Sequence, residues 1–346
     1  MYLSRKSKIS LVSVFALLVL VGWQCKLTTI TRAAIDVGSG SIKVTVAKID
    51  PKSQKIRNIL YSQEHPVPFK RDIQVGGKSV LSEKIQTVAL TKLSELKNEL
   101  AVYRPVEWRG IATAASRQAK NAQGMYDNIR DKLNVDISII SQNEEGRLGF
   151  ATAAAVSNMD PAKLISVDSG SGSFQLTTLI NGDLEVIEGD LGYIPSLEML
   201  MDIRGKKLDL QTPPAPVELE EAKILVERMH EKMPSVSEEF LKKIKDPSNS
   251  VVGIGNENFI FSMGATGVGK DTFTKEELWN AIAKYAGKPE SEMKQFAKPN
   301  TAVLGMVLLY AIMDSMEIDQ ITSRHANGSC EGLLVDTDYW SPTVIG

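Results

Sequence analysis

Two glycine- and serine-rich turns repeat along the chain, and each begins two residues after an aspartate. The first turn lies in Asp36-Val37-Gly38-Ser39-Gly40-Ser41 and the second in Asp168-Ser169-Gly170-Ser171-Gly172-Ser173, an offset of 132 residues. Glycine allows a backbone to come close to a ligand, and successive N–H groups form a nest for an anion of phosphate size. A nearby carboxylate suits Mg²⁺ that is shared with the phosphate. The predicted phosphate-binding residues are Gly38, Ser39, Gly40, Ser41, Gly170, Ser171, Gly172 and Ser173, with Asp36 and Asp168 as metal ligands.

The segments around each turn indicate how it is positioned. A short apolar strand precedes the turn, and alternating apolar residues follow it, as in Ile42, Val44 and Val46. This pattern predicts a strand–turn–strand hairpin in each half of the chain. An ordinary hairpin turn is the alternative for one copy, but a duplicated turn sequence favours a duplicated role. We therefore expect two similar domains that face each other across a cleft holding both turns.

Length and composition narrow the classes of protein. A chain of 346 residues is long enough for two domains. With 40 basic and 42 acidic residues, the chain has a net charge of −2. This charge excludes a protein that binds nucleic acid mainly through electrostatic contacts with the phosphate backbone. Two cysteines and three histidines do not support a disulfide framework or a zinc site. A divalent cation bound by carboxylates remains the expected cofactor.

The amino terminus has the pattern of an export signal or a membrane anchor. Arg5, Lys6 and Lys8 precede an apolar run over 9–23, which as a helix is about 22 Å long and shorter than a bilayer core. These proportions favour a secretory signal, so we expect an exported protein, periplasmic or membrane-anchored, that faces outside the cytoplasm. Lipid modification of Cys25 and a buried helix are the alternatives.

Three segments follow from these patterns. Residues 1–31 form the signal or anchor, 32–141 the first domain with the first turn, and 142–346 the second domain with the second turn. Helices are expected over 82–103, 118–133, 144–156, 217–245, 274–285 and 301–316. The last of these is apolar at helical spacing, and its methionines indicate core packing.

The segment from Gly264 to Asp271 is close to a nucleotide-binding P-loop. Asp271 follows Gly269-Lys270 at the position where a P-loop needs a hydroxyl for Mg²⁺. We therefore interpret the segment as a glycine-rich turn before a helix. Thr274 and Glu277 have the spacing of a capping box at the start of that helix.

Five segments, in order, resemble the exopolyphosphatase/guanosine pentaphosphate phosphatase (Ppx/GppA) family of the actin–sugar kinase–Hsp70 superfamily. They are the two turn segments, Thr113–Asn121, Ile140–Leu148 and Gly328–Leu334. The resemblance implies an α/β fold of two actin-like, ribonuclease H-like domains with an interdomain cleft. It also implies a Mg²⁺-dependent (or other divalent-cation-dependent) hydrolase that releases the terminal phosphate of inorganic polyphosphate.

The resemblance also implies catalytic roles for two residues. Glu145 would orient or deprotonate the attacking water, and Arg117 would contact the phosphate. Phosphoryl transfer depends on such positioning and charge neutralisation, and the arginine fork suits phosphoryl oxygens. An acidic pair that opens a helix is the alternative for Glu144-Glu145, and a surface ion pair is the alternative for Arg117.

Several positions depart from the family pattern. Gln175 replaces a glutamate that lies near the metal and the attacking water, and an amide cannot act as a base. Asn256-Glu257 replaces a glycine-threonine pair and adds negative charge near the expected ligand. These departures support a second hypothesis, a catalytically weakened envelope protein that binds polyphosphate or a phosphate-rich nucleotide.

Other partners and functions are also open at this point. Further candidate partners are the membrane, if the first segment is not cleaved, and a second copy of the chain in a homodimer. A sugar kinase-like enzyme is a third hypothesis, but it would need ATP outside the cytoplasm.

Overall fold

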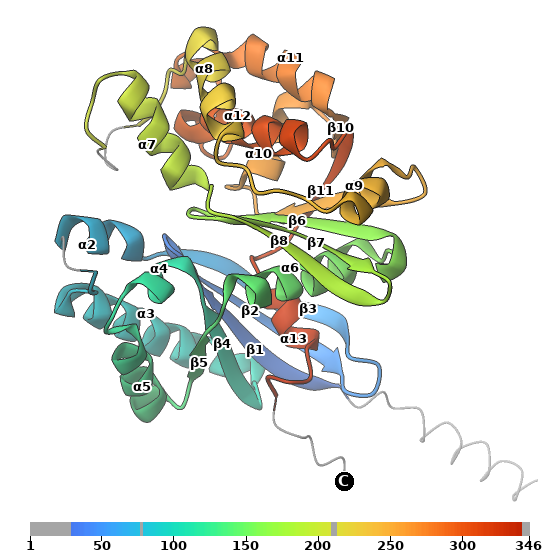
Figure 1. Cartoon of the computed structure of the whole chain (residues 1–346). Helices are drawn as coiled ribbons and strands as arrows, with labels where there is room; N and C mark the ends of the chain where they lie inside the picture. Colours follow the sequence, from blue (N-terminus) through green and yellow to red (C-terminus); the bar gives the residue numbers. More distant parts are fainter. Residues whose placement is uncertain (1–28, 77–78, 209–212, 341–346) are drawn as a thin grey trace, which may run out of the picture.

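Two lobes, each built on one β-sheet, make up the part of the chain that the structure describes (Figure 1). The computed structural model describes residues 29–76, 79–208 and 213–340. The apolar run over 9–23 and Cys25 therefore lie outside the described residues. Within the described ranges, no helix has the length and apolar character needed to cross a membrane.

The first sheet has five strands in the order β3-β2-β1-β4-β5. The strands are β1 Ile30–Val37, β2 Ser41–Asp50, β3 Lys55–Pro66, β4 Glu107–Ala112 and β5 Asp136–Ile139. The first three are antiparallel, whereas β4 and β5 run parallel to β1. The helices of this lobe are α2 Phe69–Gly76, α3 Glu83–Leu100, the 3₁₀ turn η1 Ala101–Tyr103, α4 Ala114–Gln118 and α5 Ala122–Leu133.

The second sheet repeats this topology and adds one strand, in the order β10-β11-β9-β6-β7-β8. Its strands are β6 Leu164–Ser169, β7 Phe174–Ile180, β8 Asp183–Gly189, β9 Ser250–Gly255, β10 Thr272–Thr274 and β11 Gln320–His325. As in the first sheet, three antiparallel strands continue into two parallel ones, β9 and β11. The predicted α/β fold of two similar domains is confirmed.

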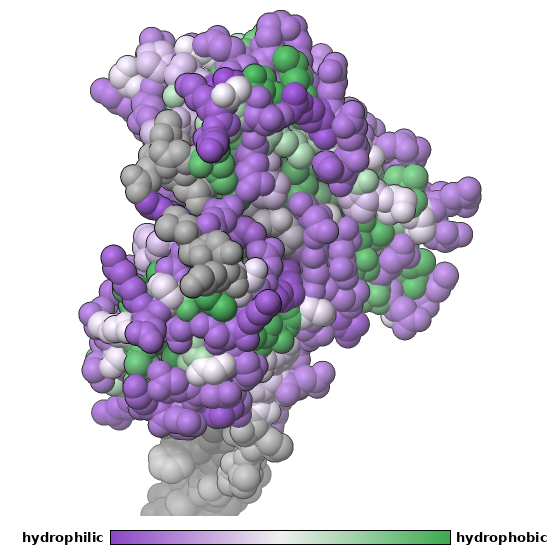
Figure 2. Space-filling model, turned by 60° about the vertical axis from the view of Figure 1, so that its left-hand side comes forward, coloured by the Kyte–Doolittle hydropathy of each residue, from purple (hydrophilic) through white to green (hydrophobic). Residues whose placement is uncertain are grey.

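The helices of the second lobe cover the outer face of its sheet (Figure 1). They are α7 Tyr193–Ile203, α8 Leu219–His230, α9 Glu238–Lys245, α10 Ile260–Val268, α11 Lys275–Tyr285 and α12 Pro299–Ser315, with 3₁₀ turns η2 Pro161–Lys163 and η3 Glu290–Glu292. Helix α12 is buried on nearly every side from Ala302 to Met313, so its methionines do pack in a core. On the face that Figure 2 shows, hydrophilic residues dominate both lobes and hydrophobic ones form small groups.

Two helices lie between the sheets and join the lobes (Figure 1). Helix α6, Gln142–Ser157, packs on the second sheet, and α13, Cys330–Val335, packs on β1, β2 and α6. Leu333 and Leu334 of α13 share a buried cluster with Ala34 and Ile111 of the first sheet. The chain therefore returns to the first lobe after β11. The domain division at residues 141 and 142 stays a prediction.

Most expected helices form, with local differences that have physical reasons. The helix expected over 217–245 is two helices, because Pro234 lies in the break and Ser237 caps the start of α9 by accepting from the Phe240 N–H. The helix expected from residue 118 begins at Ala122, and a separate short helix, α4, precedes it. The capping box of Thr274 and Glu277 is confirmed.

The P-loop-like segment is not a turn. Residues 264–268 belong to α10, and only Gly269 ends the helix in a left-handed conformation. A Cβ on Gly264 would lie 2.7 Å from the Phe273 ring, so this glycine allows close packing inside the lobe. The expectation of a glycine-rich turn over the whole segment was wrong, because these glycines serve helix packing.

Candidate functional site

The two repeated turns have the same local geometry. In the first, the Gly38 N–H donates to the Ser41 carbonyl oxygen at 2.9 Å, and in the second the Gly170 N–H donates to the Ser173 carbonyl oxygen at 2.9 Å. Each turn therefore closes its hairpin with the equivalent hydrogen bond. The sequence repeat is also a structural repeat.

Each turn is held from outside by the segment that begins the following helix. The Lys70 N–H donates to the Ser39 carbonyl oxygen at 2.9 Å, and the Ile194 N–H donates to the Ser171 carbonyl oxygen at 2.8 Å. Because a trans peptide directs its N–H opposite to its C=O, the N–H groups that follow these carbonyls, those of Gly40 and Gly172, point away from the helices. This arrangement favours the anion nest that the sequence predicts.

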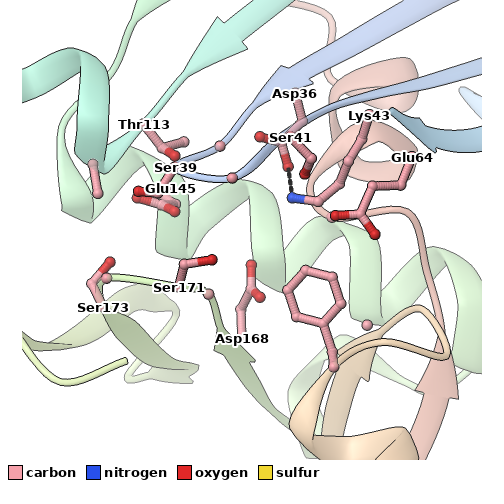
Figure 3. Close-up of a pocket in the computed structure, with 18 of the residues that line it drawn as sticks. Asp36, Ser39, Ser41, Lys43, Glu64, Thr113, Glu145, Asp168, Ser171 and Ser173 are labelled. Atoms are coloured by element: carbon pink, nitrogen blue, oxygen red, sulfur yellow. Dashed lines mark hydrogen bonds and ion pairs between the residues drawn. The ribbon is translucent and has the colours of Figure 1, made fainter. Parts of the chain in front are cut away.

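The two turns face each other across one cavity of about 140 Å³ (Figure 3). A Cβ on Gly172 would lie 3.7 Å from the Ser39 hydroxyl oxygen, and a Cβ on Gly40 would lie 3.8 Å from the Ser171 hydroxyl oxygen. The structure thus brings together all eight predicted phosphate-binding residues, both predicted metal ligands and Glu145 in the wall of this cavity.

Asp36 has one hydrogen-bonded carboxylate oxygen and one that lacks a partner among the described residues. Its Oδ2 atom accepts hydrogen bonds from the Lys43 ammonium at 3.1 Å and from the Ser329 N–H at 3.1 Å. Gly328 approaches so closely that a Cβ there would lie 2.1 Å from Oδ2, and its φ of +65° favours glycine. The Oδ1 atom is buried and has no hydrogen-bond partner among the described residues.

Two further carboxylates have raised pKa values. Burial, together with repulsion from Asp36, raises the pKa of Asp168 to about 6, although Lys43 opposes the rise. Burial also raises the pKa of Glu145 to about 7, with smaller contributions from Asp168 and Asp36 and with Arg117 acting against them. A carboxylate with a pKa near neutral pH can accept a proton from water and release it again. Glu145 is therefore suited to act as a general base.

Arg117 contacts Glu145 and is not among the residues that line the cavity. Its Nη1 atom donates to Glu145 Oε2 at 2.9 Å and to the Ile140 carbonyl oxygen at 3.1 Å. Side chains of both residues are mostly buried, with 23% and 14% exposure for Arg117 and Glu145. The predicted contact between Arg117 and phosphate stays a prediction. In the structure, Arg117 positions the carboxylate of Glu145.

Lys43 also lines the cavity, beside Asp36, and was not among the residues predicted from the sequence (Figure 3). Lys43 is paired with Asp36 across the hairpin, and Gln175 is paired with Asp168 in the equivalent register of the second hairpin. Burial lowers the pKa of Lys43, but Asp36, Glu64 and Asp168 together raise it above its ordinary value. The ammonium is therefore charged. The signal was a lysine between the apolar residues Ile42 and Val44, at the repeat position of Gln175. Other lining residues without a predicted role include Glu64, Thr113, Phe259 and Lys298.

Gln175 and the pair Asn256-Glu257, which depart from the family pattern, lie outside this cavity. Gln175 is 2% exposed, and its amide donates to the Ser173 hydroxyl oxygen at 3.3 Å. Asn256 is buried, whereas Glu257 is exposed and lies 3.4 Å from His325. Neither Gln175 nor the pair is among the lining residues. The expectation that this pair crowds the ligand is not supported by its position.

Known proteins resemble this chain over most of its length. The model of the Ppx/GppA phosphatase family matches residues 45–338. Exopolyphosphatase 1 of Mycobacterium leprae is 24% identical over 159 residues, which is 44% of this chain and 44% of that protein. The chain thus matches less than half the length of that curated relative.

Solved structures show the same fold. A family member from Aquifex aeolicus has a TM-score of 0.67 and 22% identity, with 89% of this chain and 97% of that chain covered. An exopolyphosphatase from Cytophaga hutchinsonii has a TM-score of 0.66 and 15% identity, with 88% and 96% covered. The two-lobed actin-like fold is shared with these proteins.

Proposed function

The chain belongs to the Ppx/GppA phosphatase family, and from this premise we propose that it is a phosphohydrolase that releases the terminal phosphate of inorganic polyphosphate. The observation that supports this proposal is one cavity that combines two opposed phosphate-sized turns with Glu145, whose pKa is about 7. A family relative is named an exopolyphosphatase.

The proposed reaction uses the chain's own groups as follows. The two turns bind the terminal phosphoryl group, and Lys43 balances part of its negative charge. Glu145 accepts a proton from a water molecule whose oxygen forms the new bond to phosphorus. The P–O–P bond breaks on the opposite side, and its electron pair leaves with the shortened chain. Arg117 keeps the Glu145 carboxylate in place.

The site fits a divalent cation that is held jointly with a phosphate. Asp36 offers a buried, unpartnered oxygen, and Asp168 lies in the same cavity. Among the described residues, no group of three or more His, Cys, Asp or Glu side chains could hold a metal without help. One or two carboxylates completed by phosphate oxygens and water is the usual arrangement for Mg²⁺. Bound there, the cation would neutralise charge on the phosphoryl oxygens.

Phosphate release from polyphosphate tests the proposal. We expect the purified protein to release phosphate with Mg²⁺ and to lose this activity with a chelator. Salt-sensitive binding of polyphosphate without any release would instead support the alternative, a binding protein of the same fold. Neither release nor binding would exclude both.

We also propose that the protein is exported or anchored, facing outside the cytoplasm. Support comes from the basic residues Arg5, Lys6 and Lys8 before the apolar run over 9–23. Fractionation of cells that express the full chain, beside a variant lacking residues 9–23, tests this. The export proposal expects only the variant in the cytosol, so wild-type protein found there with its first residues intact would contradict it. A homodimer stays a prediction.

A further inference from the structure

Glu64 is a carboxylate placed where an anion would be expected. It lies near the end of β3 in the first lobe, and its Oε2 atom accepts hydrogen bonds from the side-chain amides of Asn256 at 2.9 Å and Asn258 at 3.2 Å. These asparagines follow β9 in the second lobe, so the contact crosses the cleft. An anionic side chain of one lobe is thus bound by donors of the other.

Cationic and hydroxyl groups complete the surroundings of Glu64. Burial would raise the pKa of Glu64, but the Ser41 hydroxyl, Lys43, Asn256 and Lys298 together lower it below its ordinary value. The carboxylate is therefore ionised at neutral pH. Its donors are those that a phosphate group of a bound chain would also use.

Glu64 also stands at the junction of three cavities. It lines the cavity of about 140 Å³ between the two turns, called the phosphate cavity below. It also lines a second cavity of about 110 Å³ and a third cavity of about 370 Å³. The apolar side chains of Phe259, Ile260 and Met263 line part of the second cavity, where Lys298 is the only cation among the described residues. Gly170 and Ser171 of the second turn also line this second cavity, but the rest of its lining is less rich in glycine and serine than the phosphate cavity.

The geometry of the reaction directs the leaving chain toward Glu64. Figure 3 shows Glu145 and Glu64 at opposite ends of the site, with Asp36 and Asp168 between them. The attacking water and the leaving oxygen lie on opposite sides of the phosphorus in phosphoryl transfer. Water positioned by Glu145 therefore places the departing phosphates on the side of Glu64.

We propose that Glu64 determines specificity by occupying the anion position at the leaving-group end of the cavity, so that short phosphate chains are favoured over long ones. A short chain fits between the turns and Glu64. A long chain must displace this carboxylate from its asparagines or pass beside it at the cost of like-charge repulsion. This inference rests on the proposed phosphohydrolase function and specifies the substrate class.

Glu64→Gln tests this, because the amide keeps a similar shape and one acceptor oxygen but removes the charge. Binding and phosphate release would be measured with tripolyphosphate and with a long-chain polyphosphate. We expect the ratio of long-chain to tripolyphosphate affinity to rise by about tenfold or more, the scale of one charge repulsion near a protein surface. Glu64→Ala should change the ratio in the same direction and provides a second variant if the first does not fold.

Glu257→Gln is the matched control, because it removes the same charge from a carboxylate outside the phosphate cavity. Glu257 follows Asn256 directly in the chain, is exposed, and lies 3.4 Å from His325. It lines the third cavity, but neither the phosphate cavity nor the second cavity. We therefore expect Glu257→Gln to leave the affinity ratio as in the wild type.

The outcomes separate this inference from the function on which it rests. If the wild-type protein binds tripolyphosphate and releases phosphate from it, but the affinity ratio stays unchanged in both Glu64 variants, the role of Glu64 is refuted and the proposed function stands. An equal change for both substrates, or the same change in Glu257→Gln, would show a general charge effect and also refute it. No binding of either substrate by any of the proteins would overturn both proposals.

Discussion

Replacing Glu145 with glutamine separates the chemical role of this carboxylate from its effect on stability. The amide has nearly the same shape and can still accept the hydrogen bond that Arg117 donates at 2.9 Å. It cannot accept a proton from water. We therefore expect Glu145→Gln to lose activity and, at neutral to alkaline pH, to gain stability.

The size of the stability change follows from the pKa. Burial raises the pKa of Glu145 from 4.5 to about 7, and each unit of pKa corresponds to about 1.36 kcal/mol. Keeping the carboxylate ionised in the folded protein at high pH therefore costs about 3 kcal/mol. Since the folded state holds the proton more tightly than the unfolded state, the wild-type free energy of unfolding falls as pH rises from about 4.5 through about 7. The variant lacks this titration, so the two proteins should be similarly stable near pH 4.5 and differ by up to about 3 kcal/mol above pH 7.

Denaturant unfolding at several pH values and kcat/KM with tripolyphosphate measure the two effects. Loss of a general base should lower kcat/KM by about 10²- to 10⁴-fold. In the wild type, kcat/KM should rise about tenfold per pH unit below pH 7 and level off above it. Glu144→Gln is the matched control, because Glu144 accepts from the Tyr339 hydroxyl at 3.0 Å and does not line the cavity.

Two results would refute this reasoning. Equal kcat/KM for Glu145→Gln and the wild type would exclude Glu145 as the base. A stability difference that does not depend on pH would show that its carboxylate does not titrate with a raised pKa in the folded protein.

Three further substitutions test other parts of the site. Lys43→Met removes the cation beside Asp36 and should weaken tripolyphosphate binding by about tenfold or more, with a smaller salt dependence in calorimetry; unchanged affinity would contradict its role. Gly192→Ala would place a Cβ 2.7 Å from backbone atoms of the second turn. We therefore expect about 1–3 kcal/mol of destabilisation in thermal unfolding, together with lower activity. Gly124→Ala is the control, because the space around Gly124 is open and the substitution should be tolerated. Arg117→Met removes the charge that lowers the pKa of Glu145, so the pH profile of kcat/KM should move to higher pH; a raised KM with an unmoved profile would instead indicate that Arg117 contacts phosphate.

Local sequence patterns were sufficient to predict the hairpins, the turns and most helices. Glycine and serine between alternating apolar residues determine a turn through backbone preferences that act over a few residues. The 132-residue offset between Asp36 and Asp168 made the duplication visible, and the two sheets have matching strand order. The start of α11 followed from the spacing of Thr274 and Glu277 alone.

Contacts between residues distant in the chain determined the features of the site that the sequence did not predict. Whether Arg117 meets a phosphate or Glu145 depends on how α4 and α6 pack, and whether Gln175 lines the cavity depends on the direction of its side chain in β7. The raised pKa of Lys43 depends on carboxylates that include the distant Glu64 and Asp168, and the near-neutral pKa of Glu145 arises from burial. Such effects depend on three-dimensional distance and dielectric surroundings. The sequence therefore determined which residues form the two turns, whereas the tertiary structure alone determined how Lys43, Glu64 and Glu145 are arranged around them.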